Sequence, residues 1–202
     1  QNLQTFNRGI LVLLFCFSIT SLIAGKLVPT PLMQQEAKWL VQALQQAHYN
    51  KVSVKDLNST GFIHSYLKKL DKQKLYFTQS HINEFLDKYS PPLITYFEQG
   101  NLFPGFEIYN IYKAMSLERL KWVLNYLNKD FDFETNSSYQ TNRDEFPWED
   151  NEIDLNKTWK NLIKYEILAE ILSSYDSNMT YLKCKGEKFS NIAQDSKEKV
   201  RK

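Results

Sequence analysis

The sequence predicts an all-α fold, a multi-helix, bundle-like domain preceded by an apolar N-terminal segment. In most segments apolar residues recur at positions i, i+3, i+4 and i+7, which places them on one face of a helix. No segment shows the sustained alternation of apolar and polar residues that is typical of a strand. With 202 residues, 43% of them apolar, the chain is long enough to bury a substantial core.

The first 25 residues contain an uncharged apolar stretch that begins after Arg8. Gly9–Gly25 is 17 residues long, which lies between the roughly 7–15 apolar residues of a secretory signal and the roughly 20 of a spanning helix. Ala24 and Gly25 suit signal peptidase, whereas Leu22 and Ile23 are large where a small residue is preferred. Residues 1–25 are therefore expected to be a signal peptide or an N-terminal anchor, with a buried core helix as the third alternative.

The two cysteines offer no internal disulfide to an exported chain. Cys16 lies inside the apolar stretch, so its removal with a signal peptide would leave Cys184 alone. Leu14 and Phe15 are unlike the small residues that precede a lipidated cysteine. We interpret both cysteines as structural or incidental, and expect the core to stabilise the domain.

The first helix is expected from Thr30 to Tyr49, with Thr30 as its N-cap and Pro31 as its first residue. Its apolar face is Ala37, Leu40, Val41 and Leu44. A second helix is expected behind Ser53–Asp56, which has the outline of a capping box with Asp in place of Glu. Its apolar face is Ile63, Tyr66, Leu67 and Leu70.

A turn over Asp71–Tyr76 is expected to lead into a third helix, capped by Thr78 and running through Tyr89. Its apolar residues are Ile82, Phe85 and Leu86. Ser90-Pro91-Pro92 breaks this helix, because a residue before proline disfavours the helical conformation. A short helix from Pro92 to Glu98 follows and ends at Gly100.

The longest periodic run predicts a helix over Gly105–Asn128. Its apolar positions are Ile108, Ile111, Tyr112, Met115, Leu120, Val123, Leu124 and Leu127. The polar stretch Phe131–Trp148 predicts a long loop that packs by its own aromatic residues. A last helix is expected over Asp150–Ser174, burying Leu155, Trp159, Leu162 and Ile163.

Candidate catalytic motifs are weak. Ser65 and Lys68 have S-x-x-K spacing, one helical turn apart, but the companion motifs S-D-N and K-T-G are missing. The histidines His48, His64 and His81 are scattered, and His81 with Glu84 gives only H-x-x-E. No Gly-rich phosphate loop and no G-x-S-x-G elbow occur. We therefore predict no catalytic, cofactor-binding or metal-ligating residue, and no cofactor.

Two further patterns have ordinary explanations. An acidic cluster lacks the glycine and the alternating spacing of a calcium-binding loop, and helix N-termini attract acidic residues in any case. Its members are Asp144, Glu145, Glu149, Asp150, Glu152 and Asp154. Glycosylation sequons occur at Asn58, Asn136, Asn156 and Asn178, and they matter only if the source glycosylates exported proteins.

Two ordered sets of residues resemble the N-terminal helical domain of tail-specific proteases, the periplasmic C-terminal-processing peptidases. The first set lies between His48 and Glu84 and comprises His48-Tyr49 and Tyr66-Leu67-Lys68-Lys69-Leu70-Asp71. The second set is Asp132-Phe133, Tyr139, Arg143, Pro147-Trp148, Thr158-Trp159, Lys164 and Leu168. Asn142 stands where the family carries Asp before the arginine. The likeness covers Pro31–Ser174.

In that family this domain precedes a PDZ domain and a serine protease domain with a Ser-Lys dyad, neither of which lies in these 202 residues. No catalytic residue is carried over, and Ser65 and Lys68 do not correspond to the dyad. The resemblance implies a scaffold that is exported, periplasmic or inner-membrane associated. Its implied partners are the downstream PDZ and protease domains of the same protein and a periplasmic adaptor protein.

The expected organisation is a signal peptide or anchor over 1–25, the helical domain over 30–174 and a charged tail over 175–202 that begins a further helix or is truncated. The function expected is that of a noncatalytic scaffold of an exported tail-specific serine protease, present as a fragment. The alternative is a stand-alone exported helical adaptor without enzymatic activity.

Charge gives no reason to expect a nucleic-acid partner. The net charge is only +2. Lys183–Lys202 carries +4, with seven basic and three acidic residues, which is compatible with contact to nucleic acid or anionic lipid but fits better a solvated helix or a frayed end. Membrane contact is expected only through the N-terminal segment, if that segment is not cleaved.

Overall fold

The computed structural model describes residues 25–47, 53–133, 135, 137–174, 197–198 and 200–201. Within these residues the named elements are α2 (Pro31–Ala47), η1 (Val54–Asp56), α3 (Ser59–Leu70), α4 (Gln79–Tyr89), α5 (Leu93–Glu98), α6 (Phe103–Tyr126) and α7 (Glu152–Ser174). No strand is among them, and the all-α prediction is confirmed. The apolar segment Gly9–Gly25 lies outside the described residues except for Gly25.

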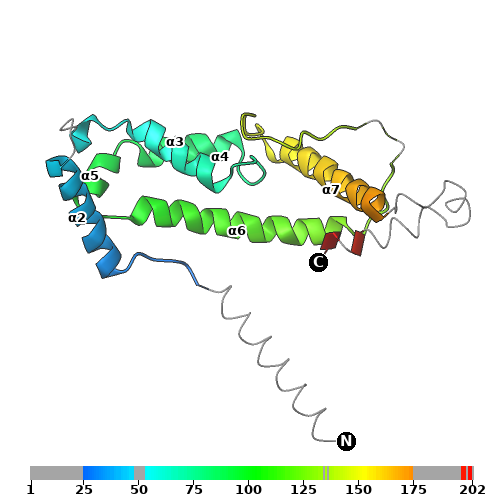
Figure 1. Ribbon diagram of the computed structural model, residues 1–202, viewed down its shortest axis with the longest axis horizontal. Helices are drawn as coiled ribbons and strands as arrows, with labels where there is room; N and C mark the ends of the chain where they lie inside the picture. Colours follow the sequence, from blue (N-terminus) through cyan, green and yellow to red (C-terminus); the bar gives the residue numbers. More distant parts are fainter. Residues whose placement is uncertain are drawn as a thin grey trace, which may run out of the picture.

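The helices form an elongated, two-layered arrangement (Figure 1). Helix α6 runs along the length of the molecule, with α3 and α4 over its first half and α7 beyond them, towards its C-terminal end. Helices α2 and α5 lie at the end where α6 begins. None of the helices in the described part of the chain has both the length and the apolar character that crossing a bilayer requires.

The described residues form two separate hydrophobic cores along α6. The first joins α3, α4, α5 and the start of α6, and its buried residues are Ile63, Leu67, Phe77, Ile82, Phe85, Tyr89, Leu93, Ile108 and Trp148. The second joins the end of α6 to α7, and its buried residues are Leu127, Ile163, Ile167 and Ile171. A single apolar face on α6 therefore serves two different sets of partners.

The described end of the charged tail packs on the second core. Val200 contacts that core, and Lys197 is buried with its Nζ donating to the carbonyl of Lys129 at 2.8 Å. The same Nζ lies 4.9 Å from the centre of the Phe131 ring. These residues are thus held against the end of α6.

The predicted and observed helix boundaries agree well for α4 and less well for α3. Helix α4 follows Thr78 and ends at Tyr89, as predicted. The start of the preceding helix was placed wrongly, because Ser53 caps the short turn η1 through the N–H of Lys55. Asn58 caps α3 instead, by accepting the N–H of Gly61 at 2.8 Å.

The apolar face predicted for α2 is only partly covered. Ala37 and Val41 are half-buried, but Leu40 is 61% exposed and Leu44 is 49% exposed. Helix α2 packs on α5 at Gly100, where an added Cβ would lie 2.4 Å from the carbonyl oxygen of Gln34. That contact uses a neighbouring face of the helix. The periodicity therefore identified the amphipathic helix but not which face is buried.

The aromatic residues of the 131–148 loop pack mainly on helices, which differs from the prediction that they pack with one another. Phe131 and Phe133 do stack, 6.1 Å apart, but both also join the second core. Trp148 enters the first core and Phe146 is exposed. The loop is therefore fixed at both ends by different cores.

Candidate functional site

A dense set of polar contacts forms a clasp, the contact between the turn 71–78 and the loop 142–149. Asp71 ends α3 and is only 2% exposed. Its carboxylate accepts the backbone N–H groups of Leu75 at 2.8 Å, Tyr76 at 3.1 Å and Phe77 at 2.9 Å, together with the indole N–H of Trp148 at 3.1 Å. Four donors thus satisfy a buried negative charge and fix the turn.

Lys74 brings a buried positive charge to the same turn. Its φ of 55° lies in the left-handed region, which is unfavourable for a residue with a Cβ. The 2% exposed side chain donates to the carbonyls of Lys72 and Asp144, and its Nζ lies 5.3 Å from the centre of the Trp148 ring. Burial lowers the pKa of Lys74 and nearby Lys68 lowers it further, while Asp144 acts in the opposite direction.

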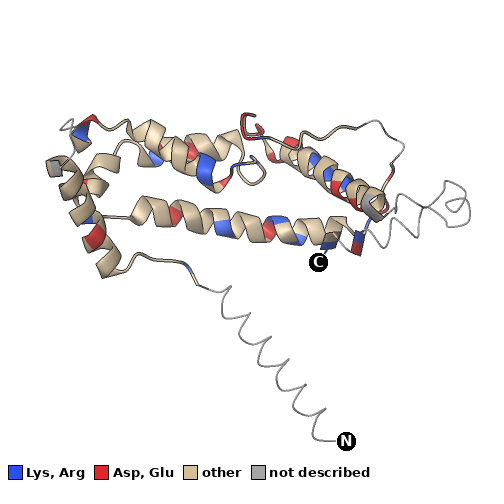
Figure 2. Cartoon of the chain, viewed as in Figure 1, with Lys and Arg blue, Asp and Glu red and all other residues tan. Residues whose placement is uncertain are grey.

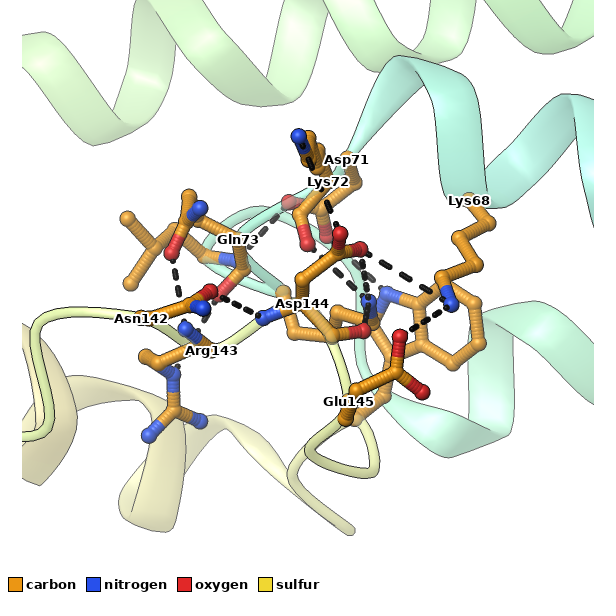
Figure 3. Close-up of polar contacts among 11 residues, drawn as sticks. Lys68, Asp71, Lys72, Gln73, Asn142, Arg143, Asp144 and Glu145 are labelled. Carbon is orange, nitrogen blue, oxygen red and sulfur yellow. Dashed lines mark hydrogen bonds and ion pairs between the residues drawn. The ribbon is translucent and has the colours of Figure 1, made fainter.

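Arg143 joins the other side of the clasp. Its backbone N–H donates to the side chain of Gln73 at 3.0 Å, and its Nε donates to the Gln73 carbonyl at 3.2 Å. Its Nη2 donates to Glu149 at 2.7 Å, and Glu149 also accepts the hydroxyl of Thr158 at 2.7 Å. In Figure 3, Arg143 and Asp144 of the loop lie directly against Gln73 and Lys72 of the turn.

The clasp also reaches α7. The indole of Trp159 donates to the carbonyl of Leu75 at 2.5 Å, and its ring meets Tyr76 edge to face at 5.9 Å. Trp159 is half-buried, whereas the sequence predicted that it is mostly buried. Trp159 therefore contacts the turn through both its indole N–H and its ring.

The S-x-x-K pair is not arranged as a nucleophile and base. Ser65 is exposed on α3. The ammonium of Lys68 is turned to the loop, 3.3 Å from Glu145 and 3.7 Å from Asp144 (Figure 3). A catalytic dyad requires the serine and its base to share a hydrogen bond, and this lysine is engaged with carboxylates.

The histidines lie in different places. His48 is outside the described residues, and the exposed His64 meets the Trp148 ring edge to face at 5.4 Å. His81 accepts the backbone N–H of Thr78 at 3.2 Å, so it closes the cap of α4. Glu84 is exposed. Among the described residues, no three His, Cys, Asp or Glu side chains are placed to hold a metal ion together.

The acidic cluster is dispersed among separate partners. Asp144 lies 3.7 Å from each of Lys68, Lys72 and Lys74. Glu152 pairs with buried Arg119 at 3.0 Å, and Asp154 accepts from Asn151 at 2.9 Å. These carboxylates serve local ion pairs and caps and do not converge on one point.

Two of the sequons serve the fold. Asn58 is the cap of α3, and the amide oxygen of Asn156 accepts from the guanidinium of Arg119. That guanidinium also lies 5.1 Å from the Trp122 ring and 5.7 Å from the Trp159 ring. Asn136 and Asn178 lie outside the described residues. Arg119 is a residue that sequence analysis missed, because nothing in a helical stripe distinguishes a buried arginine from a solvated one.

Within the described part of the chain, two apolar surfaces are open. One is the exposed face of α2, formed by Leu32, Met33, Trp39, Leu40 and Leu44. In Figure 2, charged residues, coloured blue and red along the ribbon, are sparse on α2 and frequent on α7 and in the clasp. The other is a groove of about 430 Å³ between α3, α5 and the start of α6. Exposed apolar surfaces of this kind are typical of interaction sites.

Comparison with known proteins identifies the family. A sequence model for the tail-specific protease N-terminal domain matches residues 40–202. A curated relative, the tail-specific protease of Haemophilus influenzae, is 30% identical over 160 residues, which are 79% of this chain. The matched region is 23% of that relative, so the chain spans about a quarter of its length. The matched residues include the clasp, and the family match continues beyond Ser174 through the charged tail.

Proposed function

Because this chain belongs to the tail-specific protease N-terminal domain family, we propose that it is the noncatalytic helical scaffold of an exported tail-specific serine protease. One observation carries the proposal: the side chains on which the family resemblance rests hold the fold together. Asp71, Arg143 and Trp148 form the clasp, and Trp159 joins it to α7. Residues engaged in this way support a framework and do not form a nucleophile–base pair.

The scaffold attaches to the downstream PDZ and protease domains of the same protein, which carry the Ser-Lys dyad. The exposed face of α2 is the proposed attachment surface, since large exposed apolar patches mark interaction sites. The length of the Haemophilus relative, of which this chain covers 23%, supports the existence of such domains. A periplasmic adaptor protein is a further partner of the assembled enzyme.

The first test asks whether the chain cuts peptide bonds. The purified chain is incubated with an unstructured substrate carrying a C-terminal tag, and we expect the substrate to stay intact. Ser65→Ala and Lys68→Ala serve as matched variants. Specific cleavage that either substitution abolishes would overturn the noncatalytic role.

The second test measures attachment. The downstream domains of the parent protein are produced separately and their binding to this chain is followed by calorimetry. Leu40→Asp on α2 is expected to weaken binding at least tenfold, because it places a charge in an apolar contact. Leu172→Asp, at a 70% exposed position on α7, is the control and leaves binding unchanged. Absence of binding would favour the stand-alone adaptor.

Export is proposed from the apolar segment Gly9–Gly25. N-terminal sequencing of the protein recovered from the periplasm is expected to begin near Gly25 or Lys26. A cytosolic product that retains Leu11 would contradict export.

A further inference from the structure

The segment that precedes α2 is attached to the side of α6 through its backbone. The Leu27 N–H donates to Oδ1 of Asn110 at 2.8 Å, and Nδ2 of Asn110 donates to the Leu27 carbonyl at 2.7 Å. Nζ of Lys113, almost one turn further along α6, donates to the Gly25 carbonyl at 3.3 Å. In Figure 1 this segment runs back from the start of α2 alongside α6. We call Asn110 and Lys113 the latch.

Side-chain burial contributes little to this attachment. Gly25 and Lys26 are exposed, and Leu27 is 46% exposed. Gly25 and Lys26 also line a cavity of about 390 Å³ against α6, so the segment and the helix are not tightly packed there. The attachment of residues 25–27 therefore depends chiefly on the latch, in which the single side chain of Asn110 both accepts from and donates to Leu27.

The latched backbone is also the backbone at which removal of the apolar segment is proposed. Cleavage near Gly25 or Lys26 requires a signal peptidase to reach the main chain around these residues. Recognition of an extended segment uses its backbone N–H and C=O groups. Those of Leu27 are bonded to Asn110, and the Gly25 carbonyl is bonded to Lys113. A docked segment therefore has to open locally before it is cut.

We propose that the latch decides whether the apolar segment Gly9–Gly25 is removed as a signal peptide or retained as an anchor. A signal peptidase that acts before the domain folds meets a free segment. Once residues 25–27 dock on α6, the peptidase cuts only the fraction of molecules in which they are released. Signal peptide and anchor are then two outcomes of one competition between cleavage and folding. The inference rests on the proposed export and adds its regulation.

The test incubates the folded whole chain, in detergent micelles, with purified signal peptidase and follows cleavage by mass spectrometry. Asn110→Ala removes both bonds to Leu27, and we expect this variant to be cut about tenfold faster than the unaltered chain, because the open fraction rises. Asn110→Asp keeps the acceptor and loses the donor, so its rate is expected to lie between these two. Asn125→Ala, at an exposed position further along α6, is the matched control and leaves the rate unchanged.

A synthetic peptide of residues 1–30, which has no latch, separates this inference from the proposed export. We expect the peptidase to cut it at least about tenfold faster than the folded, unaltered chain. A peptide that stays intact would overturn signal cleavage itself, and the inference with it. Equal cleavage of the unaltered chain and Asn110→Ala would overturn the latch alone, and so would equal hydrogen exchange of the Leu27 amide in these two chains. Circular dichroism checks that each variant is folded, and Asn110→Asp replaces Asn110→Ala if the alanine variant is not.

Discussion

Removing the carboxylate of Asp71 is expected to destabilise the domain severely. Asp71→Ala leaves four donors without their acceptor: three backbone N–H groups of the turn and the indole N–H of Trp148. A buried donor without a partner costs about 1–3 kcal/mol. Even at the lower limit the four together cost about 4 kcal/mol, a large share of the 5–15 kcal/mol that typically stabilises a domain.

The assay is urea unfolding followed by circular dichroism at 222 nm and by tryptophan fluorescence. Asp87→Ala, which removes an exposed carboxylate from α4, is the matched control and is expected to stay within about 0.5 kcal/mol of the unaltered protein. Trp148→Phe keeps an aromatic ring in the core and removes only the indole donor. Its coupling free energy with Asp71→Ala is expected to be about 1 kcal/mol.

A free energy of unfolding for Asp71→Ala within about 1 kcal/mol of the unaltered protein would refute this reasoning. It would mean that water or a rearranged turn satisfies the four donors at little cost. A coupling free energy near zero would show that Trp148 is held by packing alone and not by the carboxylate.

Three further outcomes follow from particular positions. Gly100→Ala is expected to lower the melting temperature, because φ of Gly100 is +66° and the new Cβ would lie 2.4 Å from a backbone oxygen. Gly105→Ala, whose new Cβ would have no atom within 4 Å, is expected to stabilise α6 by about 0.5–1 kcal/mol. A higher melting temperature for Gly100→Ala than for Gly105→Ala would contradict the packing of α2 on α5. Trp159→Ala is expected to lower the free energy of unfolding by about 3 kcal/mol, which corresponds to a fall of roughly 6–12 °C in melting temperature. A fall of less than about 2 °C would mean that the hydrogen bond from Trp159 to Leu75 contributes little to stability. Burial, and then the Glu107 carboxylate, raise the pKa of Tyr89 to about 12, so the unfolded chain loses this proton at a lower pH than the folded chain and the free energy of unfolding falls as the pH rises above about 10. Tyr89→Phe is expected to reduce the fall in the free energy of unfolding between about pH 9 and pH 11, measured by urea unfolding. An unchanged fall would mean that other groups cause it.

The local signals predicted most of the helices, since a cap, a periodic stripe and a breaker act over a few neighbouring residues. Helix α4 is the clearest case, because Thr78 directly precedes its first residue and Ser90-Pro91-Pro92 follows its end. The start of α3 was missed because Ser53 and Asn58 are both good caps, and the sequence does not show which one the helix uses. In the structure, α3 is capped by Asn58, which lies closer in sequence to the buried apolar residues of this helix.

The clasp could not be derived from sequence, since its partners lie far apart along the chain. Asp71 and Trp148 are 77 residues apart, and nothing in either neighbourhood identifies the other. The resemblance to tail-specific proteases singled out both residues but gave no reason for them. Coordinates supply that reason: a turn rich in backbone donors needs a buried acceptor, and a loop without helices needs an anchor.

Helix α6 sets a fixed distance across the molecule. Its 24 residues span about 36 Å. The first half of the helix packs in one hydrophobic core and its last turns pack in the other. Because each end of α6 packs into its own core, the separation between the α3–α5 end and the α7 end of the domain is fixed. The domain would then act as a spacer of constant length, holding whatever binds at its two ends in one relative orientation.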